Sequence, residues 1–94
     1  MIRLFDISEK ALNEYRSTVR GRDLISKEKA QKVLTRNIIL CDAFHHTHYS
    51  HYYYGALRMT VNKQNKIIHI KNNTRHRGRI NKVAKKLLNE VLDI

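Results

Sequence analysis

The sequence contains no proline and no tryptophan, and its only glycines are Gly21, Gly55 and Gly78. Flexible linkers and low-complexity segments are usually rich in proline, glycine or serine, and no stretch of this chain has that composition. The length of 94 residues suits one compact unit with a modest core. We therefore expect residues 1–94 to form a single domain.

Cysteine and long apolar runs are also scarce. Cys41 is the one cysteine, which excludes an internal disulfide framework and fits a reducing compartment. No apolar run approaches the roughly 20 residues of a membrane span, and the start MIRLFDISEK lacks the pattern of a secretory signal. These absences predict a cytoplasmic protein without a membrane partner.

Acidic residues are few, with 8 Asp and Glu against 19 Lys and Arg, so the formal net charge is +11. Such an excess favours a polyanionic partner, most often nucleic acid. A structural protein embedded in ribosomal RNA would share it, as would a membrane-surface protein. The hydrophobic fraction of 41% favours a folded domain over a disordered basic arm. We expect RNA or a ribonucleoprotein as the partner.

The first third of the chain predicts a short strand and two helices. Residues 1–6 alternate like a strand, and Asp6 with Glu9 resembles a capping box for a helix that runs to Val19 or Arg20. Gly21 would close that helix in a left-handed conformation. Ser26 can cap a second helix, whose buried stripe would contain Ala30, Val33, Leu34, Ile38 and Cys41.

The remaining residues predict an antiparallel hairpin and a last helix. Leu57, Met59 and Val61 alternate with polar residues, and Ile68 and Ile70 alternate with Ile67, His69 and Lys71, around a polar turn at 62–65. Residues 52–71 therefore read as a hairpin. A helical apolar stripe follows at Ile80, Val83, Ala84, Leu87, Leu88, Val91 and Leu92. The order predicts an α+β fold: a short N-terminal strand, two helices, an antiparallel sheet with helices on one face, and a C-terminal amphipathic helix.

The stretch KNNTRHRGRINKVAKK, residues 71–86, contains many cations and no acid. Guanidinium groups pair bidentately with phosphate, so phosphate is the natural ligand, although a solvated basic surface is the plain alternative. The predicted nucleic-acid contacts in this stretch are Lys71, Arg75, Arg77, Arg79, Lys82, Lys85 and Lys86.

Residues 45–55 read HHTHYSHYYYG, with four histidines and four tyrosines. On a strand, Tyr52 and Tyr54 would share one face, where exposed rings could stack on unpaired bases beside His51. Packing in the core is the plain alternative for each tyrosine. A metal site would need Cys41, His45 and His48 aligned on a continued helix, with His51 closing the set, which is the minority interpretation. We expect no metal and no cofactor.

Histidines near these cations could also act as acid and base. RNA cleavage by attack of the 2′-hydroxyl needs a proton acceptor, a proton donor and positive charge at the phosphate, and it needs no metal. His69, His76, Arg58 and Arg75 are the candidate catalytic residues. No phosphate-binding glycine loop, G-x-S-x-G motif or paired carboxylates occur.

The stretches MIRLFDISEKALNEY and LRMTVNKQNKIIHIKNNTRHRGR resemble the small RelE/ParE-type toxins of toxin and antitoxin pairs. The resemblance implies a strand and two helices packed on an antiparallel sheet that binds messenger RNA, with Arg58, Lys71 and Arg75, His76 or Arg77 as phosphate and acid/base positions. It also implies an antitoxin partner. Ribosome-dependent members commonly have a tyrosine soon after this region, where this chain has Ile80 and Asn81. ParE-branch members inhibit a protein target instead of cutting RNA.

Two hypotheses follow from the sequence. One is a metal-independent endoribonuclease toxin. The other is a non-catalytic protein, such as a phage or mobile-element inhibitor, that binds a host nucleic acid or a nucleic-acid-binding complex. An enzyme should lose turnover when one histidine is removed, whereas a binder should lose affinity gradually with each cation.

Overall fold

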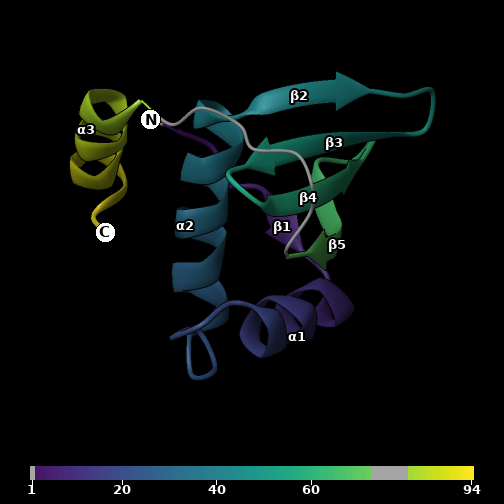
Figure 1. The fold of residues 1–94 in the computed structure, drawn as a ribbon, viewed down its shortest axis with the longest axis horizontal. Helices are drawn as coiled ribbons and strands as arrows, with labels where there is room; N and C mark the ends of the chain where they lie inside the picture. The colour runs from purple at the N-terminus through teal and green to yellow at the C-terminus, as the bar shows by residue number, and fades with distance from the viewer. Residues whose placement is uncertain (1, 73–80) are drawn as a thin grey trace.

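The computed structural model describes residues 2–72 and 81–94 (Figure 1). In chain order the elements are β1 (Asp6–Ile7), α1 (Glu9–Thr18), α2 (Lys27–Leu40), β2 (Asp42–His45), β3 (Tyr49–Tyr54), β4 (Leu57–Asn62), β5 (Lys66–Lys71) and α3 (Lys82–Leu92). The strands form one sheet in the order β1-β5-β4-β3-β2, where β1 is parallel to β5 and the other neighbours are antiparallel. The predicted α+β class is confirmed, with a larger sheet than the predicted hairpin.

Serine side chains start the first two helices. Ser26 caps α2 by accepting the Lys29 N–H, as predicted. The cap of α1 is Ser8, which accepts the Ala11 N–H, so the capping box predicted at Asp6 is wrong. The Asp6 carboxylate instead accepts the N–H of Ile7. Gly21 has the predicted left-handed conformation, with φ +80°.

The N-terminal strand is shorter than predicted. Only Asp6 and Ile7 pair, with Lys66 and Ile67 of β5. The backbone just before them bonds to side chains of α2, because the Phe5 N–H donates to Thr35 Oγ1 and Gln31 Nε2 donates to the Phe5 carbonyl. These side chains satisfy the backbone groups that a strand would otherwise need to pair.

One hydrophobic core joins the helices to the sheet. Its members are Ile7, Ala11, Leu12, Tyr15, Ile25, Ala30, Leu34, Ile38, Leu57, Met59, Val61, Ile67 and Ile70. The predicted alternation holds on β4, where Leu57, Met59 and Val61 are buried. On β5 it fails, because a register shift beside Thr60 and Val61 puts Ile67 in the core together with Ile70 and leaves Ile68 half-buried.

The strand β2 was not predicted. It pairs with β3 to form a hairpin at one end of the sheet, so most of HHTHYSHYYYG lies in this hairpin. Because α2 ends at Leu40, Cys41, His45 and His48 are not aligned on a helix. The described residues contain no group of three or more metal-ligating side chains.

The last helix, α3, packs on the side of α2 opposite the sheet (Figure 1). It buries Leu92 but leaves Val83, Leu87 and Val91 exposed. The predicted apolar stripe is therefore only partly covered. None of the described helices is long and apolar enough to cross a membrane.

Candidate nucleic-acid interface

The sheet has a face turned away from α1 and α2, which we call the distal face. Residues directly opposite on neighbouring strands share a face. Arg58 and Thr60 alternate with the core residues Leu57, Met59 and Val61 of β4, so they and their partners lie on the distal face, where Thr60 is itself only 7% exposed. These partners are Tyr53, His51, Lys71 and His69, and β2 adds Phe44 opposite His51.

Two histidines and a threonine form a row across the middle of this face. His51 of β3 lies opposite Thr60 of β4, and Thr60 lies opposite His69 of β5. Because neighbouring strands are about 4.8 Å apart, the two histidine backbones are separated by about 10 Å. The His51 Nδ1 is 2.9 Å from Thr60 Oγ1, which leaves Nε2 as the ring nitrogen without a hydrogen bond among the described residues.

The second histidine of the row is held from α1. The Nδ1 of His69 is 2.8 Å from one carboxylate oxygen of Glu14 and 3.0 Å from the other. The Glu14 carboxylate also accepts the N–H of Ile70 at 3.0 Å, beyond the point where β1 stops pairing with β5. Glu14 therefore fixes the edge of the sheet and the orientation of the His69 ring, whose Nε2 has no hydrogen bond among the described residues.

Positive charge lies beside this row. Arg58 is on the same face as His51, and its Nε is buried without a hydrogen-bond partner among the described residues. The pKa of His51 is lowered, first by burial and then by the nearby Arg58, His46 and His69. The lowered pKa favours the neutral form of His51, which is the form that a proton acceptor requires.

Aromatic rings extend from His51 along β3 and onto β2. Tyr49 has ring centroids 4.8 Å from His46 and 4.9 Å from His51. His51 is 6.3 Å from Tyr53, which makes an edge contact with Phe44 at 5.5 Å. Phe44 is 48% exposed and Tyr49 is 38% exposed. We call these five residues the aromatic row; exposed rings beside cations are the usual surface for stacking unpaired bases.

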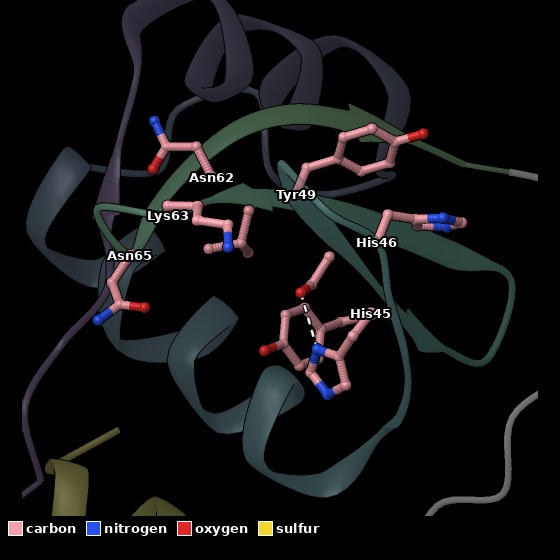
Figure 2. A pocket seen from close by; sticks show the side chains of 9 residues that line it. His45, His46, Tyr49, Asn62, Lys63 and Asn65 are labelled. Carbon is pink, nitrogen blue, oxygen red and sulfur yellow. Dashed lines mark hydrogen bonds between the residues drawn. The ribbon is translucent and has the colours of Figure 1, made fainter.

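The aromatic row ends at a cavity of about 290 Å³ between the β2–β3 and β4–β5 turns (Figure 2). His46 and Tyr49 line it from the first turn, and Lys63 and Asn65 from the second. His45 also lines it, with Nδ1 2.8 Å from Ser50 Oγ (Figure 2). The cavity is therefore polar, with a lysine at its rim.

The tyrosines predicted to stack on bases are on the other face. Tyr52 lies opposite Met59 and Tyr54 opposite Leu57, and both pack against the core. Tyr53 is the member of the run that lies on the distal face. Residues two apart on a strand share a face, so the sequence places Tyr52 and Tyr54 together but does not indicate which face the helices cover.

The other predicted contacts fall into three groups. Arg58, His69, Lys71 and His51 come together on the distal face. The lysines of α3 do not join them, because α3 lies beyond α2; these are Lys82, Lys85 and Lys86. The residues Arg75, His76, Arg77 and Arg79 lie outside the described residues.

Several residues of this surface were missed by the sequence predictions. Thr60 and Tyr53 follow from register, which requires the pairing of β3 with β4. Glu14 is 55 residues from His69 in sequence, and no local pattern connects them. His46, Tyr49 and Phe44 depend on the unpredicted β2–β3 hairpin, although the density of histidine and tyrosine there was a visible signal.

Comparison with known proteins identifies the family of this chain. The chain belongs to the YorE family, whose model matches residues 5–92. No curated protein and no solved structure matches the chain.

Proposed function

We propose that this protein binds single-stranded RNA on the distal face and cleaves it without a metal ion. The observation that carries the proposal is the row His51, Thr60 and His69 on three adjacent strands, with Arg58 beside it. The aromatic row then stacks the neighbouring bases. We also propose a cytoplasmic location, which the single cysteine supports.

The chemistry assigned to the row is an internal transesterification. Neutral His51 takes the proton of the ribose 2′-hydroxyl, and the 2′-oxygen attacks the adjacent phosphorus. His69, entering the step protonated, gives its proton to the departing 5′-oxygen. The products are a 2′,3′-cyclic phosphate and a 5′-hydroxyl, and the two histidines exchange protonation states with no net change. Arg58 stabilises the charge on the phosphorane oxygens.

The geometry supports this assignment in two ways. Each histidine uses Nδ1 in a contact with the protein, Thr60 for His51 and Glu14 for His69, so that Nε2 remains for the substrate. A separation of about 10 Å between the two strands leaves space for a phosphate between the rings. The lowered pKa of His51 favours the base role for that residue.

The relation to RelE/ParE-type toxins is also a proposal. It is supported by the order of a strand, two helices and antiparallel strands, and it would add an antitoxin partner. The competing hypothesis is the non-catalytic inhibitor, for which the same basic, aromatic surface would bind a host nucleic acid or its complex.

The deciding experiment incubates the purified protein with labelled single-stranded RNA in EDTA, with and without ribosomes. We expect cleavage that survives EDTA, leaves cyclic phosphate ends and stops when a 2′-deoxyribose replaces the ribose at the cut. His51→Ala and His69→Ala should each lower kcat by about 100-fold or more, the usual size of a general acid or base effect, while binding changes little.

His48→Ala is the matched control, because His48 is an exposed histidine outside the row. His76→Ala tests the sequence-based alternative at a position outside the described residues. Intact RNA in every lane together with tight, salt-sensitive binding would reject catalysis and favour the inhibitor. If the His48→Ala and His51→Ala variants cleave RNA at the same rate, the assignment of His51 as the base is wrong.

A further inference from the structure

A second cavity, of about 260 Å³, lies on the opposite side of the sheet. Residues from α1, α2, α3 and the β3–β4 connection line it, together with Arg22 and Asn72. Its cations are Arg22, Arg36 and Lys85, and none of its lining residues is acidic. The cavity is separate from the distal face, because Tyr54 and Leu57 point to the helix side.

Arg36 is a buried cation that has no carboxylate partner among the described residues. It is 7% exposed, and its described hydrogen bonds go to amide oxygens: Nε and Nη2 to Asn37 Oδ1, and Nη1 to Asn89 Oδ1 at 2.9 Å. Neither ion pair among the described residues includes it. Burying a guanidinium without an anion is costly, so an external anion would be strongly favoured beside it.

Tyr54 adds a buried hydroxyl to the wall of the same cavity. Its hydroxyl is buried and has no hydrogen-bond partner among the described residues. Two cations lie over its ring, Arg36 at 5.8 Å and Lys85 at 5.6 Å from the centroid. A buried hydroxyl beside two cations is placed to donate to an anion.

Tyr15 completes the polar lining. Burial raises the pKa of the Tyr15 hydroxyl, although the nearby Arg22 and Arg36 work against the rise. Because the net change is a rise, the hydroxyl stays protonated and can donate. Residues 73–80, which lie outside the described residues, read NTRHRGRI and include no Asp or Glu.

We propose that this cavity binds a phosphate group through Arg22, Arg36, Lys85 and the Tyr54 hydroxyl. Several cations and neutral donors without an acid match the charge and the acceptor oxygens of phosphate. The volume is below the range of about 300–1,000 Å³ typical of drug-sized ligands. The ligand is therefore free phosphate or the phosphate of a small nucleotide.

The test is a titration of the ¹⁵N-labelled full chain with sodium phosphate at constant ionic strength, followed by the Arg36 Nε–H signal. We expect a saturable shift that sodium chloride does not produce. Lys85→Gln and Tyr54→Phe should each weaken binding by about 10-fold or more, the size expected for one hydrogen bond to a charged group. Tyr54→Phe keeps the ring, so its packing against both cations is retained.

Lys86→Gln is the control, since it removes the same charge from the next, exposed residue of α3. Equal weakening by Lys85→Gln and Lys86→Gln, or no saturable shift, would overturn the proposal. Titration with adenosine monophosphate and with adenosine identifies the source of the phosphate. Tighter binding of the monophosphate than of phosphate indicates a nucleotide ligand, and equal affinities indicate free phosphate. Binding of adenosine as tight as that of the monophosphate would also overturn it.

Discussion

Glu14 gives the sharpest stability prediction, because one carboxylate joins α1 to the edge of β5. It accepts the N–H of Ile70 at 3.0 Å and contacts His69 Nδ1 at 2.8 Å. Ile70 is 2% exposed, and the Glu14 side chain is 24% exposed. Glu14→Ala removes both contacts and leaves the Ile70 N–H without an acceptor.

A hydrogen bond to a charged group is worth about 1.5–3 kcal/mol, and partial exposure reduces that value. We therefore expect Glu14→Ala to lower the free energy of unfolding by about 2 kcal/mol. For a domain of this size that lowers Tm by roughly 8–16 °C. Glu14→Gln keeps a carbonyl oxygen for Ile70 but loses the charge, so about 1 kcal/mol should be lost.

Urea unfolding at neutral pH measures both losses. Glu9→Ala is the control on the same helix, since Glu9 is exposed in the first turn and should contribute about 0.3–1 kcal/mol through the helix dipole. If Glu14→Ala costs no more than Glu9→Ala, Glu14 does not hold the sheet edge and the orientation argument for His69 fails.

Three further predictions concern other parts of the fold. The lowered pKa of His51 means that the unfolded chain binds its proton more readily than the folded one. The contribution of neutral His51 to the free energy of unfolding is complete above its ordinary pKa of 6.5 and is lost as pH falls through the folded pKa. Urea midpoints measured from about pH 8 to pH 5 should therefore decrease, and His51→Gln should reduce that decrease. Met59 is 0% exposed, so Met59→Ala should cost about 2–5 kcal/mol in the same assay. Asn81 caps α3 by accepting the Val83 and Ala84 N–H groups, so Asn81→Ala should cost about 1 kcal/mol and lower helicity in circular dichroism.

The elements predicted well from the sequence are those determined by neighbouring residues. Ser26 and the apolar stripe after it define α2 because capping and helical periodicity act within a few residues. The alternation of Leu57, Met59 and Val61 likewise defines β4, since a strand with one buried face repeats every two residues.

The parts that failed depend on distant partners. The two-residue β1 exists because β5 pairs with it, and the segment before it bonds to Thr35 and Gln31 instead. The register shift beside Thr60 changes which residues of β5 enter the core, and no local pattern of β5 reveals it. The same holds for Glu14, whose contact with His69 brings together residues 55 positions apart.

The three consecutive tyrosines, Tyr52 to Tyr54, lie in three different environments. Tyr52 packs on the helix side at 6.5 Å from the ring of Phe5. Tyr53 lies on the distal face opposite Arg58, within reach of the proposed RNA path. Tyr54 returns to the helix side, where its hydroxyl enters the proposed phosphate cavity. Because successive side chains of a strand point to opposite faces, a run that reads as one motif is divided between the core and two surfaces. Substitution of Tyr53 should therefore affect RNA binding without affecting phosphate, and Tyr54→Phe should do the reverse.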